Sequence, residues 1–128
     1  MPTWVITGAN RGLGLEFAKQ LLAAGHTVLA GVRRPESMEF EHPQMTVFQL
    51  DVASTTSVKD FAEQIQSVID SIDVLVNNAG RMDGRWQSIE EVDPELSLDV
   101  LNVNTIGPLR VSQALWPLLQ GSTPTKIA

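Results

Sequence analysis

The sequence contains no cysteine, and its 128 residues include only two histidines, His26 and His42. Without thiols, a disulfide framework and a thiolate-bound metal are excluded. The two histidines are not spaced as ligands, so we expect no metal site. No stretch approaches the ~18 to 20 consecutive apolar residues that a membrane-spanning helix needs. The amino terminus lacks a cationic stretch followed by an apolar run, so we predict no signal peptide and a cytoplasmic protein.

Positive charge is also scarce, because nine lysines and arginines stand against fifteen acidic residues, for a net charge of −6. Broad electrostatic attraction to nucleic acid or to an anionic membrane is therefore not expected. Any anionic ligand must be held by local geometry instead. With 43% hydrophobic and 19% charged residues, the composition is typical of a globular protein rather than a disordered one. The length predicts a single domain over residues 1–128.

Short apolar runs alternate with amphipathic segments along the chain. The runs rich in β-branched residues predict four strands, over residues 3–7, 27–32, 45–50 and 73–77, and residues 126–128 could begin another. Helical periodicity is predicted over residues 12–24, around residues 58–69, and over residues 94–119. Strands that alternate with helices predict a doubly wound α/β fold, in which right-handed crossovers connect parallel strands.

Helix boundaries are marked by cap residues. Thr55 or Thr56 is available as the cap of the second helix, and Asp93 followed by Pro94 is a favourable helix start. Gly107 lies inside the long third helix, where we expect a bend.

A glycine-rich turn follows the first predicted strand, where Thr7 to Gly14 reads T-G-A-N-R-G-L-G. Glycines let the backbone approach a pyrophosphate, and the following helix N-terminus offers unpaired N–H groups to the anion. A tight strand-to-helix turn without a ligand is the alternative interpretation. We favour nucleotide binding, with these predicted contact residues: Gly8, Asn10, Arg11, Gly12, Leu13 and Gly14.

The spacing G-x-x-x-G-x-G, led by Thr7, resembles the short-chain dehydrogenase/reductase family. Three further features lie where that family requires them: Asp51-Val52, the N-N-A-G run of Asn77, Asn78, Ala79 and Gly80, and Asn104 within V-N-T-I-G. The resemblance implies that Asp51 contacts the adenine and that Asn104 is the active-site asparagine. It also implies a Rossmann-like parallel sheet. Taken singly, Asp51 could cap a strand, the paired asparagines could form a turn, and Asn104 could be a polar helix residue.

The second strand is followed by two arginines, in the run A-G-V-R-R that ends at Arg34. A site that prefers NAD usually carries an acidic residue there for the ribose hydroxyls. Arg33 and Arg34, with Arg11 in the glycine turn, instead suit the 2′-phosphate of NADP(H). The family resemblance implies the same preference, and NAD(H) is the second choice. Solvated loop charges are the alternative interpretation.

The chemistry of the family depends on a serine, a tyrosine and a lysine located after the region that this sequence matches. The sequence contains no tyrosine, and of that family's active-site groups only Asn104 can be carried over. Arg81, Asp83 and Arg85 could substitute as polar groups, although only their position recommends them and we favour surface charge as the explanation. We therefore expect an oxidoreductase domain for carbonyl or alcohol substrates that is weak or inactive as it stands. The alternatives are a nucleotide-binding pseudoenzyme, an oligomerisation module and an inert relic.

The resemblance spans the whole chain but only about half of the family's domain, so we expect a sheet truncated after about four strands. Residues 74–76 would then form an open apolar edge, which invites pairing with another chain. The 94–119 helix would also lose cover over these apolar residues: Leu101, Leu109, Leu115, Trp116, Leu118 and Leu119. We predict a homo-oligomer through that edge or that helix.

Overall fold

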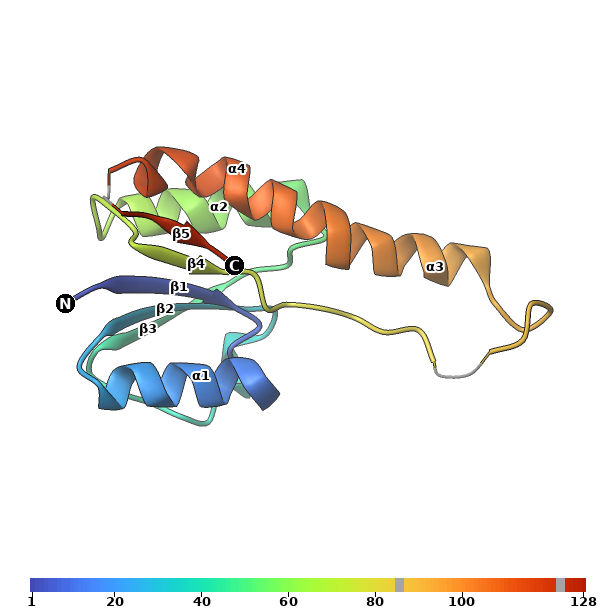
Figure 1. Ribbon diagram of the computed structural model, residues 1–128, viewed down its shortest axis with the longest axis horizontal. Helices are drawn as coiled ribbons and strands as arrows, with labels where there is room; N and C mark the ends of the chain where they lie inside the picture. Colours follow the sequence, from blue (N-terminus) through green and yellow to red (C-terminus); the bar gives the residue numbers. More distant parts are fainter. Residues whose placement is uncertain (85–86, 122–123) are drawn as a thin grey trace.

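Residues 1–84, 87–121 and 124–128 are described by a computed structural model, which shows a parallel sheet between layers of helices (Figure 1). The strand order is β3-β2-β1-β4-β5. The strands are β1 (Thr3–Thr7), β2 (Thr27–Val32), β3 (Met45–Gln49), β4 (Val74–Val76) and β5 (Lys126–Ile127). This is the strand order of a Rossmann-like sheet, with β1 at its centre. The predicted doubly wound α/β fold is therefore confirmed.

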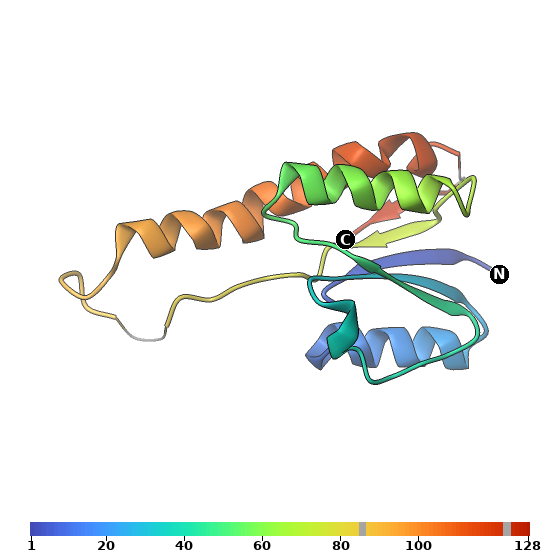
Figure 2. The same cartoon turned by 180° about the vertical axis from the view of Figure 1, so that it is seen from behind.

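Helices cover both faces of this sheet. The helix α1 (Gly12–Ala23) lies on one face, and α2 (Thr55–Gln66) and α4 (Gly107–Leu119) lie on the other (Figures 1 and 2). Two further helices, α3 (Pro94–Leu101) and the π-helical η2 (Asn102–Ile106), lead into α4, and η1 (Pro35–Ser37) is a single 3₁₀ turn after β2. Among the described residues, no helix has the length and apolar character needed to cross a bilayer.

Alternate residues of β1 supply the two halves of the core. Val5 packs with residues of α2 and α4, whereas Ile6 packs with residues of α1, and both are wholly buried. This alternation follows from the two-residue period of a strand, which directs neighbouring side chains to opposite faces. Because both faces are covered, the strand carries an unbroken apolar run rather than an alternating one.

The start of α2 differs from the prediction. Its N-cap is Ser54, whose hydroxyl accepts a hydrogen bond from the backbone N–H of Ser57 at 3.2 Å. Thr55, which the sequence offered as a cap, is the first helical residue, and Thr56 is the second. Three consecutive hydroxyl residues all have suitable chemistry, so only the backbone geometry selects the cap. Val68 lies beyond the end of the helix and is 56% exposed.

The predicted long helix consists of three consecutive segments, α3, η2 and α4 (Figure 1). Its predicted start is confirmed, since the Asp93 carboxylate accepts from the N–H of Glu95 at 2.9 Å. The π-helical segment ends directly before Gly107, where the bend was expected. A Cβ atom at Gly107 would lie 2.9 Å from Cγ2 of Val52, so glycine lets the helix approach the loop that follows β3. Pro108 lacks an N–H and cannot continue the regular hydrogen-bond pattern.

The predicted open edge at β4 is wrong, because β5 covers that strand. The N–H of Lys126 donates to the carbonyl of Asp73 at 3.0 Å, and that of Ala128 donates to Leu75 at 2.9 Å. The N–H of Asn77 donates in turn to Ala128 at 2.7 Å. Residues 126–128 thus supply the hydrogen-bonding partners that the prediction lacked for the β4 edge. The edge of the sheet is therefore β5.

The predicted apolar surface of the long helix is only partly correct. Leu115, Leu118 and Leu119 are buried in the core between α4, α2 and the sheet. Leu101 and Leu109 remain 55% and 51% exposed. Leu101 lies on α3, which extends beyond the sheet with the loop before it, whereas α4 lies over the sheet and exposes Leu109 on its surface (Figure 1). No residue of α3 is buried.

Candidate functional site

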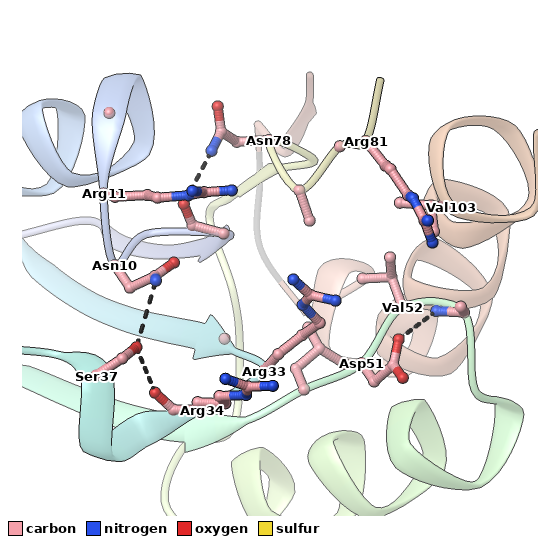
Figure 3. A pocket seen from close by; sticks show the side chains of 17 residues that line it. Asn10, Arg11, Arg33, Arg34, Ser37, Asp51, Val52, Asn78, Arg81 and Val103 are labelled. Carbon is pink, nitrogen blue, oxygen red and sulfur yellow. Dashed lines mark hydrogen bonds between the residues drawn. The ribbon is translucent and has the colours of Figure 1, made fainter. Parts of the chain in front are cut away.

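A pocket of about 570 Å³ opens at the carboxyl ends of β1, β2, β3 and β4 (Figure 3). Its walls come from the glycine turn after β1, the arginine segment after β2, the loop after β3 and the N-N-A-G run after β4. The chain winds outward from β1 in both directions, so the pocket lies at the switch point of the sheet. Parallel α/β sheets bind ligands at this place.

The hydroxyl of Thr7 joins the ends of β1 and β4. It is buried, at 1% exposure, and accepts from the backbone N–H groups of Asn78 at 3.0 Å and Ala79 at 2.9 Å. These donors lie just past the end of β4, where strand pairing no longer satisfies them. The threonine at the head of the glycine motif therefore fixes the position of the N-N-A-G run against the glycine turn.

Asn78 strengthens the same junction, since its side-chain Nδ2 donates to the carbonyl of Gly8 at 3.1 Å. A Cβ atom at Gly14 would lie 2.5 Å from that Nδ2 and 2.5 Å from the Gly8 carbonyl oxygen. Gly8 itself has φ +69°, and a Cβ there would lie 2.9 Å from Cα of Ala79. Both glycines therefore allow close contact between α1, the turn and the end of β4.

Gly12 is required for a different reason. Its φ of +59° falls in the left-handed region, yet a Cβ atom at this position would meet nothing within 4 Å. Gly12 is one of the residues that line the pocket. The N-cap residue Arg11 makes no side-chain capping bond. The first turn of α1 thus presents backbone N–H groups and the positive end of its dipole to an open space, which suits an anion.

Asp51 follows β3 and organises the opposite wall. Its Oδ1 accepts from the N–H of Ala53 at 3.0 Å, and its own N–H donates to the hydroxyl of Ser57 at 2.8 Å. The carboxylate thereby closes a tight turn and lines the pocket together with Val52. The sequence left open whether Asp51 caps a strand end or lies at the nucleotide site. In the structure it does both, since it closes the turn after β3 and lines the pocket.

Four arginines line the pocket: Arg11, Arg33, Arg34 and Arg81 (Figure 3). All four are exposed at their positions, so their charges lie at the opening rather than in the core. The loop that carries Arg34 is held by Ser37, whose hydroxyl donates to the Arg34 carbonyl at 2.7 Å. Asn10 donates from Nδ2 to that hydroxyl at 3.4 Å, which connects the glycine turn with the arginine segment. In a chain of net charge −6, this cluster makes the pocket locally cationic.

Asn104 lies in η2 and forms a reciprocal pair with the backbone of Arg81. Its Oδ1 accepts from the Arg81 N–H at 2.7 Å, and its Nδ2 donates to the Arg81 carbonyl at 2.7 Å. The guanidinium of Arg81 lies 3.9 Å from the carboxylate of Asp99, and both side chains are about half exposed. Asn104 therefore fixes the backbone just after the N-N-A-G run, beside the pocket.

Most of the predicted contact residues do line the pocket, but three do not. Leu13 is 83% exposed on the surface of α1. Gly14 is buried in the contact between α1 and the turn, and Asn77 uses its N–H to pair with β5. Of the polar groups considered as substitutes for the missing donor, Arg81 lines the pocket and Asp83 does not. Arg85 lies outside the described residues.

Six lining residues were not predicted as cofactor contacts: Gly31, Ser37, Leu50, Ala53, Arg81 and Val103. Leu50, Ala53, Arg81 and Val103 adjoin predicted positions in sequence, which was the available signal. Gly31 had a further signal, as the glycine of A-G-V-R-R. A Cβ atom there would lie 2.6 Å from Cδ2 of Leu50. No group of three or more metal-binding side chains occurs within the described residues.

Comparison with known sequences decides the family. The family model described as short chain dehydrogenase matches residues 2–128. The chain belongs to the short-chain dehydrogenase family. The chain is 36% identical over 124 residues to an uncharacterised oxidoreductase of Schizosaccharomyces pombe, covering 91% of this chain and 48% of that protein. It is 30% identical to (+)-neomenthol dehydrogenase of Arabidopsis thaliana, covering 96% of this chain and 51% of that enzyme.

Solved structures of short-chain dehydrogenases show the same fold. The NADPH-bound carbonyl reductase from chicken fatty liver superposes with a TM-score of 0.83 and 31% identity, over 94% of this chain and 52% of that one. A short-chain dehydrogenase of Burkholderia cenocepacia in complex with NADP gives a TM-score of 0.85 and 31% identity, over 98% and 51%. The chain thus spans about half the length of the relatives that it matches.

Proposed function

We propose that residues 1–128 act as one NADP(H)-binding domain of a cytoplasmic short-chain oxidoreductase that acts on carbonyl or alcohol substrates. This proposal is supported above all by one observation: the glycine turn, the N-terminus of α1 and a cluster of arginines meet in one pocket. The relatives with bound NADPH or NADP support this choice. A reductase of Brucella melitensis complexed with NADH, at 27% identity, keeps NAD(H) as the second choice.

The residues present fit a dinucleotide with a 2′-phosphate. Gly12 and the first turn of α1 would hold the diphosphate, and Gly8, packed against Ala79, would shape the turn beside it. The cations that would hold the 2′-phosphate are Arg11, Arg33 and Arg34. Asp51 and Val52 would line the adenine, as the family resemblance implies. The N-N-A-G run would close the pocket from the β4 side.

We expect low catalytic activity of these 128 residues, because they lack the tyrosine that serves as proton donor in the family. NADP(H) supplies a hydride when it is bound. Carbonyl reduction also needs a proton, and the chain has no tyrosine to provide it. Asn104, the one matched active-site residue, has its amide engaged with the Arg81 backbone. Positioned acid–base catalysis contributes about 10²- to 10⁴-fold in rate, so we propose weak turnover or none.

A nucleotide-binding pseudoenzyme is the second candidate, supported by the intact glycine cradle beside the absent tyrosine. NADPH oxidation measured with a panel of aldehydes and ketones separates the two candidates. Turnover above the rate with NADPH alone supports slow catalysis. Binding without any such turnover supports the pseudoenzyme.

Replacing Arg33 with glutamine is expected to weaken NADPH binding by about ten- to a hundredfold while leaving NADH affinity nearly unchanged. One charge-assisted contact to the 2′-phosphate is worth about 1.5 to 3 kcal/mol, and NADH lacks that phosphate. Isothermal titration calorimetry with both nucleotides measures the effect. Lys59→Gln is the matched control, because Lys59 is exposed on α2 and does not line the pocket.

An equal loss for NADPH and NADH in the Arg33 variant would contradict the 2′-phosphate assignment. Absence of heat with either nucleotide in the parent chain would contradict the cofactor proposal altogether. The control variant should match the parent chain for both ligands.

We also propose a homo-oligomer through the long helix. Four large apolar side chains are at least half exposed along it, namely Leu98, Leu101, Leu109 and Trp116. Leu98 and Leu101 lie three residues apart on α3, and Leu109 and Trp116 lie seven apart on α4, so each pair forms an apolar stripe on one face of its helix. Apolar stripes of this kind mark surfaces that associate, and a second copy would bury the same stripe from both sides.

The double variant Leu101→Glu/Leu109→Glu is expected to shift the protein to a monomeric mass at micromolar concentration, because paired carboxylates would face each other across the contact. Sedimentation velocity measures the change. Val68→Glu, at a residue 56% exposed outside this helix, should leave the mass of the parent chain unchanged. A monomeric parent chain would contradict the proposal.

A further inference from the structure

Arg110 on α4 joins its own helix and the preceding η2 to a loop 58 residues earlier in the sequence. Its Nη1 donates to the carbonyl of Val52 at 3.1 Å and to that of Asn102 at 3.4 Å. Its Nη2 donates to Oδ1 of Asn102 at 2.6 Å. The side chain of Asn102 extends the connection, since Nδ2 donates to the carbonyl of Ala53 at 3.4 Å. One guanidinium thus ties α4 to η2 and to the loop after β3.

Both segments held by Arg110 contribute to the pocket. Val52 and Ala53 form the wall next to Asp51, and Val103 belongs to η2. Asn104, the next residue of η2, fixes the backbone of Arg81, which also lines the pocket. Arg110 itself does not line the pocket, so its influence on a ligand passes through these two segments.

The chemistry of Arg110 suits a clamp rather than an ion pair. Arg110 is partly buried, and no carboxylate among the described residues lies within 4.0 Å of its guanidinium. Its recorded acceptors are two backbone carbonyls and one side-chain amide oxygen. The fixed fork of a guanidinium can bridge acceptors on different segments simultaneously. Single-turn π-helical segments are rare and frequently lie at functional sites, and this one begins at the clamped residue.

We propose that Arg110 is a positioning residue. It holds the loop of Val52 and Ala53 and the η2 segment that contains Asn104 in fixed positions relative to each other, and so shapes the pocket for its nucleotide. Its role in binding rests on the proposed NADP(H) function. Its role in ordering the two segments stands on the hydrogen bonds alone. The two parts can therefore be tested separately.

The test compares Arg110→Met with Gln113→Met, which places the same side chain at an exposed site of α4. Amide hydrogen exchange is followed by NMR at Ala53 and Asn104, with Val5 in the core of β1 as the reference. In Arg110→Met, exchange at both sites is expected to accelerate about tenfold or more, with Val5 unchanged, because local opening no longer breaks charge-assisted bonds. NADPH affinity should fall about tenfold, and Arg110→Lys should recover part of both effects.

Equal exchange in the Arg110 and Gln113 variants would overturn the inference, whatever their affinities. Acceleration that extends equally to Val5 would also overturn it, since it would mean general destabilisation. Local acceleration in a chain that binds no NADPH would support the positioning role and refute the proposed cofactor. Local acceleration with unchanged NADPH affinity would overturn the proposed effect on the ligand.

Discussion

A Gly12→Asp variant is expected to lose NADPH affinity by about a hundredfold or more, since a like charge placed against a bound anion costs several kcal/mol. Gly12 has φ +59°, a conformation that aspartate tolerates better than most residues. A Cβ atom there would meet no protein atom within 4 Å and Gly12 lines the pocket, so we expect the added carboxylate to face the bound phosphates without clashing with the protein. Calorimetric titration measures the loss.

Gly12→Asn is the matched control, with nearly the same shape and no charge. Its affinity should fall by about tenfold, because the side chain still obstructs backbone approach while adding no repulsion. The two variants should differ by less than about 1 kcal/mol in free energy of unfolding, since both adopt the same left-handed backbone conformation. Equal NADPH affinities in the two variants would contradict an anion site beside Gly12.

A Thr7→Val variant is expected to lose about 1 to 3 kcal/mol of the free energy of unfolding, because the partly buried N–H of Ala79 would be left without an acceptor, whereas that of Asn78 keeps the Val76 carbonyl at 3.1 Å. Valine has nearly the shape of threonine but cannot accept a hydrogen bond. The N–H groups of Asn78 and Ala79 would then lose the acceptor that they share at present. Urea unfolding measures the loss.

Thr7→Ser separates the hydroxyl from the methyl group at the same position. It keeps the acceptor and should cost only about 1 kcal/mol, the value of one buried methyl group. A serine variant as unstable as the valine variant would show that packing, rather than hydrogen bonding, is the contribution of Thr7. The predicted order of stability is threonine, then serine, then valine.

Local pattern was sufficient to predict the architecture of the sheet and the positions of most pocket segments. Gly8 follows β1, Gly12 begins α1, and Asp51 lies just after β3. In a parallel sheet such positions meet at one edge, so the strand prediction also located the pocket. Arg33 and Arg34 were predicted because the residues at the end of the second strand contact the nucleotide ribose in Rossmann-like sites.

Side-chain partners were much harder to predict than positions. The hydrogen bonds between Asn104 and the Arg81 backbone cross 23 residues, and the one from Arg110 to Val52 crosses 58. No periodicity links such residues, because their contact depends on the packing of α4 against the loop after β3. Similarly, Lys126 and Ile127 form too short a run to specify a strand, and pairing with β4 makes it one.

The Thr7 contacts with Asn78 and Ala79 have a consequence for how the protein folds. They span 71 and 72 residues, and the central strand β1 cannot complete its pairing until β4 is available. Long-range parallel pairing carries a high loop-closure cost and belongs to the slow part of folding. Segments containing residues 8–12 alone therefore cannot form the pocket. Nucleotide affinity would report completed folding of the sheet, and ligand would raise the apparent melting temperature by binding only that state.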